Sequence, residues 1–173
     1  MLEDTITASI HPKADYHRVV KVALNLIEGY GLHREPQRMV DLSPLFGAID
    51  LRFMQMPEEL YGFTLDLQEK LIVGLNDELD ERQTRFVAAH ELGHIAMWHP
   101  NQFNHCLQGG WFYTKLEKEA TAVAAYLLVP REVVAKGLLD SHRRSLVEGL
   151  AAHYKVPPQL MLVRRALLAA TGY

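Results

Sequence analysis

The residues His90-Glu91-Leu92-Gly93-His94 indicate the kind of helix and the chemistry that we expect of this chain. In an α-helix, residues four apart lie on one face, about one turn from each other. The imidazoles of His90 and His94 can therefore bind one metal ion, and Zn²⁺ accepts neutral imidazole nitrogen in a roughly tetrahedral site. Glu91 lies beside His90 on the same turn, where it can reach a water next to the ion but is poorly placed as a third ligand. The pattern predicts two zinc ligands, His90 and His94, and a general base, Glu91.

The flanking residues favour a helix over about residues 80–98. Asp80 and Gln83 have the spacing of a capping box, and the acidic residues around them suit the positive end of a helix dipole. Apolar residues then recur at steps of three and four until Pro100, which cannot continue a helix. Glycine lowers helix stability relative to alanine, so Gly93 inside this helix predicts close packing against another backbone.

The composition fits a single domain with its own core. The chain has 173 residues, of which 49% are hydrophobic. It has no apolar run near the roughly 18 residues of a membrane span and no signal-peptide pattern after Met1. The single Cys106 excludes an internal disulfide framework and suits a reducing cytosol. We therefore expect a cytoplasmic protein that is not attached to a membrane.

The charge of the chain is uneven along its length. Residues 1–130 hold 11 basic and 18 acidic residues, whereas residues 131–173 hold 7 basic and 3 acidic residues. A basic C-terminal segment can contact nucleic acid or an acidic partner. A solvated helical face explains the same pattern, and so few charges favour that simpler interpretation.

The rest of the chain predicts an α+β fold in which a small three-stranded sheet packs on helices. Three short segments are predicted as strands: 50–56, 61–65 and 71–75. A hairpin turn over residues 66–70 makes the sheet mainly antiparallel, and its last strand should border a cleft where an extended peptide adds as another strand. Helical spacing recurs in six further segments: 15–28, 40–46, 116–128, 131–139, 141–153 and 159–170.

A catalytic zinc site usually has three protein ligands, so one more ligand must come from elsewhere in the chain. His99 and His105 follow the motif, but Pro100 stands where the pattern H-E-x-x-H-x-x-G-x-x-H needs its third histidine, which excludes that variant. A glutamate on the next predicted helix would complete a His₂Glu site. Glu117 shares a face with small residues that permit close helix approach, whereas Glu119 points about 200° away. The geometry favours Glu117 and leaves Glu119 as the alternative.

Two stretches resemble the signatures of the ImmA/IrrE family of zinc metallo-endopeptidases. Residues 82–94, R-Q-T-R-F-V-A-A-H-E-L-G-H, are similar to the metal-binding helix of that family. Residues 116–130, L-E-K-E-A-T-A-V-A-A-Y-L-L-V-P, resemble its second signature, in which the conserved glutamate falls on Glu117. The sequence departs from that signature at Thr121, where the family has Asn or Asp, and at Val123, where it has Phe.

The resemblance covers roughly residues 18–168 and implies a gluzincin-like endopeptidase. It implies a zincin-like core over residues 15–139 and a helical C-terminal segment over residues 140–173, packed together as one domain. One Zn²⁺ per chain would be held by His90, His94 and Glu117, although such a ligand set also suits other divalent ions. Glu91 would act as general base and then as general acid.

Other residues of the resembling stretches would support this site. Thr121 stands where a hydrogen bond to a ligand histidine is expected, and its change from Asn or Asp could weaken that bond. Tyr113 and Tyr126 are candidate donors to the oxyanion that forms during peptide hydrolysis.

The resemblance also implies the partner. Family members typically cleave a helix-turn-helix repressor, often encoded beside them, and so release a stress or mobile-element programme. Two alternatives remain: a non-catalytic module that binds a repressor, and a DNA-binding protein. The second alternative rests on residues 150–165, which resemble a helix-turn-helix, and on four arginines, Arg143, Arg144, Arg164 and Arg165. The sequence does not predict an oligomeric state.

Overall fold

The computed structural model describes residues 14–33, 39–68, 70–100, 114–135 and 144–173. Its elements are, in chain order, α2 (Tyr16–Tyr30), η1 (Ser43–Phe46), β1 (Ile49–Met54), β2 (Gly62–Asp66), β3 (Leu71–Asn76), α3 (Glu81–Ala96), α4 (Lys115–Leu128), α5 (Arg131–Ala135), α6 (Arg144–Tyr154) and α7 (Pro158–Thr171). The predicted α+β class is confirmed. The second predicted helix is a short 3-10 turn, η1, and residues 136–143 of the predicted C-terminal helices lie outside the described residues.

The three strands form a mixed sheet in the order β1-β3-β2. The predicted antiparallel pairing is confirmed for β2 and β3, which are joined by a tight turn, whereas β1 pairs with β3 in parallel. The loop from β1 to β2 passes over the end of β3, where the buried Asn76 side-chain amide donates to the carbonyl oxygens of Pro57 and Leu60. The last strand is therefore central, and it is β2 rather than β3 that lies at a sheet edge beside α3.

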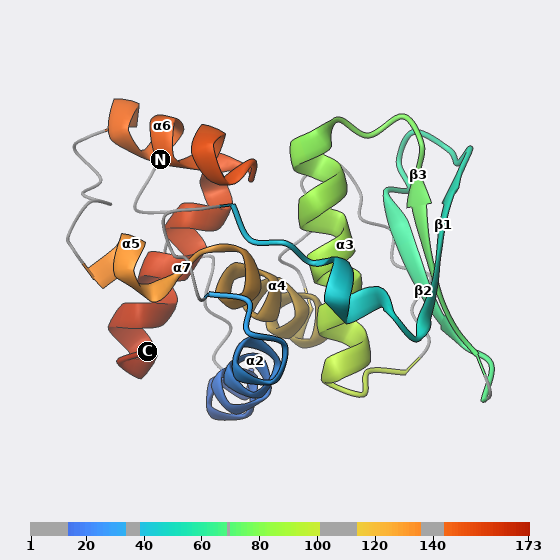
Figure 1. Ribbon diagram of the computed structural model, residues 1–173, viewed down its shortest axis with the longest axis horizontal. Coiled ribbons are helices and arrows are strands. Elements are labelled where there is room, and N and C mark those ends of the chain that lie inside the picture. Colours follow the sequence, from blue (N-terminus) through green and yellow to red (C-terminus); the bar gives the residue numbers. More distant parts are fainter. Residues whose placement is uncertain (1–13, 34–38, 69, 101–113, 136–143) are drawn as a thin grey trace.

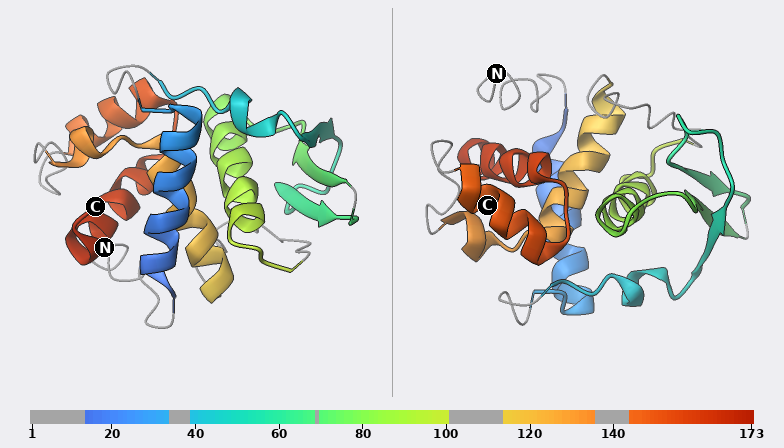
Figure 2. Two further views of the ribbon diagram at one scale, coloured as in Figure 1. Left: turned by 60° about the horizontal axis from the view of Figure 1, so that its bottom comes forward. Right: turned by 90° about the horizontal axis from the view of Figure 1, so that it is seen from above.

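The elements stack in layers with α3 in the middle. Figure 1 shows the sheet on one side of α3 and α4 on the other, with α2 and α7 beyond α4. The two turned views in Figure 2 show the same order of layers. Residues 86–94 of α3 and residues 118–128 of α4 are buried, so the core lies along the contact between these two helices. Within the described ranges, no helix is both long and apolar enough to cross a membrane.

Local sequence explains how α3 begins and how closely it packs. The Asp80 side chain accepts the backbone N–H of Gln83, and the Gln83 side chain accepts the Asp80 N–H, so the predicted capping box is present. Gly93 faces the backbone of Ala120 on α4, and a Cβ added at Gly93 would lie 2.7 Å from the Ala120 carbonyl oxygen. The close backbone packing predicted from Gly93 is confirmed.

Candidate metal centre

Three potential ligands converge where α3 meets α4. His90 and His94 point from one face of α3, and Glu117 points at them from the first turn of α4. The Nε2 atom of His90 lies 3.1 Å from Nε2 of His94 and 3.0 Å from Oε2 of Glu117. One ligand atom from each of the three residues lies within 4.8 Å of the others. The spacing of four residues on α3 and the close approach permitted by Gly93 together produce this convergence.

The outer nitrogen of each histidine has its own partner. Nδ1 of His90 lies 3.2 Å from the hydroxyl oxygen of Thr121 on α4. Nδ1 of His94 lies 2.9 Å from Nδ1 of His99, just beyond the end of α3. Metal-binding histidines commonly use the ring nitrogen that does not bind the ion for such contacts, which fix the orientation of the ring. Both rings are therefore held with Nε2 directed into the cluster.

The electrostatics of the cluster suit a cation. Burial lowers the pKa of His94 to about 4, so its imidazole is neutral at pH 7, as a metal ligand must be. Burial alone would raise the pKa of Glu117, but hydrogen bonds with His90 and His94 outweigh it and hold that pKa below its usual range. At neutral pH the cluster thus presents a neutral imidazole at His94 and a carboxylate at Glu117.

Glu91 lies on the adjoining face of α3 and contacts the edge strand β2. It is fully buried, and its Oε2 accepts a 2.6 Å hydrogen bond from the Thr64 hydroxyl. Its other carboxylate oxygen, Oε1, is buried and has no hydrogen-bond partner among the described residues. Burial raises the pKa of Glu91 to about 7, against the opposing influences of His90 and of the Thr64 hydrogen bond. A carboxyl group with such a pKa can accept and release a proton near neutral pH.

These features fit a divalent metal ion better than a purely structural role. Two imidazole nitrogens and a carboxylate form the donor set of His₂Glu zinc sites. The unpartnered oxygen of Glu91 is a buried acceptor that a water at the site would satisfy. The donor set does not by itself select zinc over other divalent ions.

Two of the residues predicted to support the site have different outcomes. Tyr126 lies half a helix turn away from Glu117 around α4, and its hydroxyl contacts Thr171 and the carbonyl of Tyr173 near the C-terminus. It is therefore not brought to the cluster, because nine positions along a helix reverse the direction of a side chain. Tyr113 lies outside the described residues.

The structure adds three residues that the sequence did not assign to the site. Thr64 contacts Glu91. His99 contacts Nδ1 of His94, the ring nitrogen that faces away from the cluster, and Glu119 contacts His99. The alternation of β2 offers a signal for Thr64, since a polar residue at an inward position of a strand needs a buried partner. For His99 and Glu119 the sequence indicates only a role as a direct metal ligand and does not predict their contact with each other.

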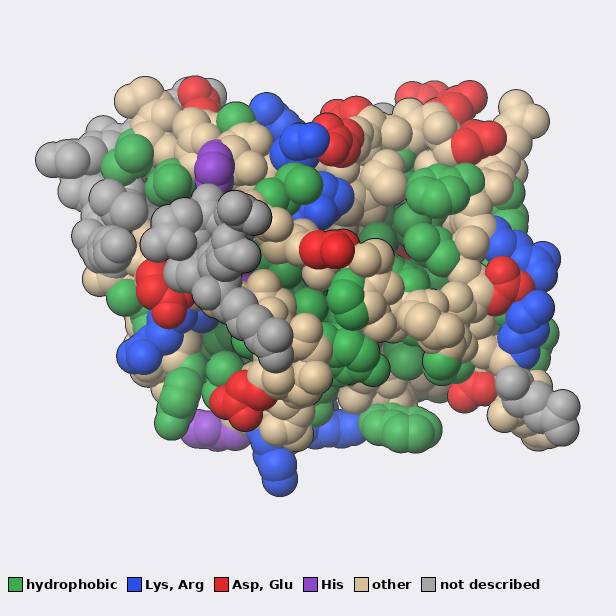
Figure 3. Space-filling view, in the orientation of Figure 1, with side chains coloured by type: hydrophobic (Ala, Val, Ile, Leu, Met, Phe, Trp, Pro, Cys, Tyr) green, Lys and Arg blue, Asp and Glu red, His purple; other side chains and the backbone are tan. Residues whose placement is uncertain are grey.

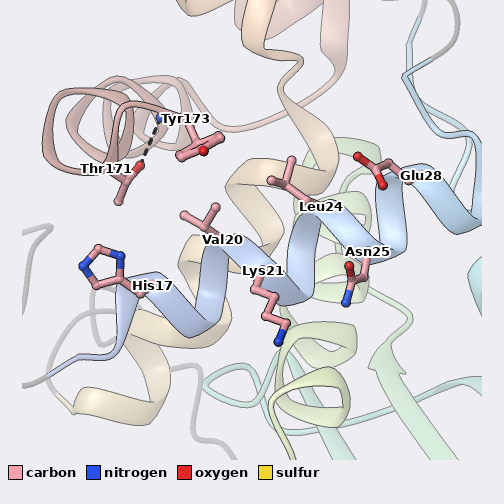
Figure 4. A pocket seen from close by; sticks show the side chains of 8 residues that line it. All are labelled: His17, Val20, Lys21, Leu24, Asn25, Glu28, Thr171 and Tyr173. Carbon is pink, nitrogen blue, oxygen red and sulfur yellow. Dashed lines mark hydrogen bonds between the residues drawn. The ribbon is translucent and has the colours of Figure 1, made fainter.

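A groove runs beside the site, between the end of α3 and the turn that joins β2 to β3. Its lining includes Thr64, His99 and the highly exposed Trp98. A second groove lies between α2 and the end of α7 and shares no residue with the metal cluster (Figure 4). Of these two grooves, only the first includes a residue that contacts Glu91, namely Thr64.

The fold and the cluster define a metallopeptidase of the H-E-x-x-H class, with a glutamate as third potential ligand. The family model Peptidase_M78, described as the IrrE N-terminal-like domain, matches residues 48–165, so the chain belongs to this family. The resemblance to ImmA/IrrE metallopeptidases is confirmed. A comparison with curated proteins found no match.

Proposed function

We propose that this chain is a zinc-dependent endopeptidase that acts in the cytoplasm and cleaves a peptide bond in a helix-turn-helix repressor. The observation that carries the proposal is the convergence of His90, His94 and Glu117 within 4.8 Å beside a buried glutamate whose pKa is raised to about 7. Membership of a peptidase family supports the reaction, and the family resemblance supports the repressor as substrate.

Each residue has a defined role in this proposal. His90, His94 and Glu117 would hold the ion, which when bound would polarise the scissile carbonyl and acidify water. Glu91 takes a proton from the attacking water and passes it to the leaving amine, which its raised pKa permits. Thr64 orients the Glu91 carboxylate through its 2.6 Å hydrogen bond, and Thr121 orients His90.

The edge strand β2 is the natural place for an extended substrate. One side of β2 pairs with β3, and no strand of the described residues pairs with its other side, the position at which a peptide strand adds to a sheet. Thr64 belongs to β2 and also lines the groove beside the site, so a peptide that follows this strand would pass close to Glu91. This supports hydrolysis within a protein chain rather than of a small molecule.

The alternatives have less support. The hypothesis of a non-catalytic module assumes that Thr121 weakens the metal site. However, the hydroxyl oxygen of Thr121 lies 3.2 Å from Nδ1 of His90 and can serve as its hydrogen-bond partner. The hypothesis of a DNA-binding protein includes Arg164 among the residues that contact DNA. Arg164 is buried and donates to the carbonyls of Val129 and Tyr173, so it is not available for such a contact. On the face shown in Figure 3, acidic and basic side chains are interspersed rather than gathered into a basic patch.

The test compares cells that express the wild type with cells that express Glu91→Gln, by mapping all new protein N-termini. The substitution keeps the shape of the side chain and an oxygen for Thr64 to contact, but it removes the basic carboxylate. We expect a new N-terminus inside a helix-turn-helix repressor in wild-type cells and none with the variant, while both proteins keep their zinc. Glu78→Gln, an exposed carboxylate before α3, is the matched control.

Two results would contradict the proposal. The same cleavage with Glu91→Gln would refute the assigned base. New N-termini that depend on Glu91 but never fall in a transcriptional regulator would refute the substrate class and leave the peptidase activity in place.

A further inference from the structure

The turn that ends α3 places His99 directly on the ligand His94. Met97 is the C-cap, and Trp98 adopts the left-handed conformation with a φ of 55°. The N–H of Trp98 donates to the carbonyl of Ile95 and the N–H of His99 donates to that of His94, both at 3.0 Å. These two bonds define a Schellman motif, in which the residue after the left-handed one lies near the helix residue that accepts its N–H. Here both residues of that pair are histidines.

His99 joins His94 to a buried carboxylate on α4. Its Nδ1 lies 2.9 Å from Nδ1 of His94, and its Nε2 lies 3.1 Å from Oε2 of Glu119. The side chains of His99 and Glu119 are only 4% and 3% exposed, so water competes little for these contacts. The other oxygen of Glu119 accepts the backbone N–H of Asp15 at 2.7 Å and lies 3.6 Å from Nζ of Lys115.

The row of contacts therefore links three helices. It begins at His94 on α3, crosses to Glu119 on α4 and ends at Asp15, the N-cap of α2. A separate contact joins α2 to the end of α3, since Arg18 of α2 donates to the carbonyl of Met97, the C-cap of α3, at 2.8 Å. Asp15 and Arg18 lie outside residues 48–165, so part of the support for the site comes from beyond the segment that matches the family model.

The hydrogens of the row can be placed without ambiguity once His94 binds an ion. Where two Nδ1 atoms lie 2.9 Å apart, one must carry the hydrogen and the other must accept it. If Nε2 of His94 binds the ion, the single hydrogen of that neutral ring is on Nδ1 and is donated to His99. The hydrogen of His99 is then on Nε2 and is donated to Glu119. Every donor meets an acceptor, and the row ends on a carboxylate.

We infer that His99 and Glu119 are positioning residues that hold His94 in the tautomer and ring orientation in which Nε2 binds the metal ion. This inference rests on the proposed function, because it takes the ion to lie at the cluster of His90, His94 and Glu117. Partners of this kind typically contribute about 10- to 100-fold to metal affinity. His90 has a different partner in the same place, the uncharged hydroxyl of Thr121.

The experiment measures the Zn²⁺ affinity of the full chain by competition with a chromophoric chelator. His99→Leu removes both contacts of the ring. His99→Asn provides an amide oxygen where Nδ1 of His99 now accepts from His94. Glu119→Gln leaves one acceptor oxygen for two donors. His17→Leu is the matched control, since His17 is an exposed histidine on α2.

Two further measurements separate positioning from a general structural effect. Urea unfolding in excess chelator shows whether each metal-free variant is folded. The visible absorption spectrum of the Co²⁺-loaded protein reports the geometry of the ligands around the ion, which a loss of stability alone would not change.

We expect His99→Leu to raise the zinc dissociation constant by about 10- to 100-fold and to alter the cobalt spectrum. His99→Asn should recover most of the affinity, Glu119→Gln should lie between the wild type and His99→Leu, and His17→Leu should match the wild type. If His99→Leu does not fold, His99→Asn and Glu119→Gln decide by the same measurements.

Two different results overturn different claims. A wild type that binds zinc while the His99 and Glu119 variants bind it equally well overturns the inference alone. A wild type that binds no zinc overturns the proposed function and, with it, the inference.

Discussion

Replacing Gly93 with alanine tests whether the contact between α3 and α4 builds the metal centre. The added Cβ would lie 2.7 Å from the carbonyl oxygen and 2.9 Å from Cα of Ala120, both backbone atoms. Backbone cannot rotate out of the way as a side chain can, so α3 and α4 must move apart. Ala120 lies between Glu117 and Thr121 on α4, and the same shift would carry both residues away from His90.

The magnitude follows from a matched pair of glycines. Alanine is favoured over glycine in a helix interior by about 1 kcal/mol, whereas overpacking a filled core position costs about 1–3 kcal/mol. A Cβ at Gly149 on α6 meets nothing within 4 Å, so Gly149→Ala keeps the gain without the clash. The two variants should therefore differ in free energy of unfolding by about 1–3 kcal/mol, or about 2–4 °C in Tm for each kcal/mol.

The assay is urea unfolding followed by circular dichroism, with excess chelator so that bound metal does not contribute to stability. Gly93→Ala should be less stable than the wild type, and Gly149→Ala should be equally or more stable. Gly93→Ala should also bind zinc more weakly. Equal stability of the two variants, with unchanged zinc affinity, would refute the argument that close backbone packing at Gly93 brings Glu117 to the histidines.

Three further substitutions test other parts of the account. Thr64→Val removes the hydroxyl that donates to Glu91, so zinc content should stay unchanged while single-turnover cleavage slows by about 10- to 100-fold, because the base loses its orientation; unaltered cleavage would show that Thr64 does not orient it. Tyr126→Phe removes the hydroxyl that contacts Thr171 and Tyr173, so the free energy of unfolding measured with urea should fall by about 1 kcal/mol while cleavage stays unchanged. A loss of cleavage would show instead that Tyr126 acts as an oxyanion donor. Arg164→Met should cost about 2–4 kcal/mol of stability, since it removes buried hydrogen bonds and a cation–π contact, and should not alter binding to duplex DNA in a salt titration.

The parts of the site that follow from helical periodicity could be predicted from the sequence. A spacing of four residues puts His90 and His94 on one face, and the capping box at Asp80 marks where that helix begins. Gly93 predicts a close approach of another backbone, which α4 makes. The small residues on the next helix favour Glu117 over Glu119 as the residue that faces the histidines. Local sequence determines these features.

The parts that depend on tertiary arrangement could not be predicted in the same way. The parallel pairing of β1 depends on a loop that passes over β3 and is fixed by Asn76, which no local pattern in the strands reveals. Thr64 meets Glu91 across 27 positions of sequence. The Schellman turn that places His99 on His94 lacks its usual signal, because Trp98 occupies the left-handed position where glycine is common.

The metal content per chain shows whether His90, His94 and Glu117 hold one zinc ion. Elemental analysis should compare the wild type with Glu117→Ala, after zinc is supplied and the excess removed. We predict about one zinc per chain for the wild type and much less for Glu117→Ala, as expected for a His₂Glu site. A wild type without bound zinc, or a Glu117→Ala variant that retains it fully, would contradict the account.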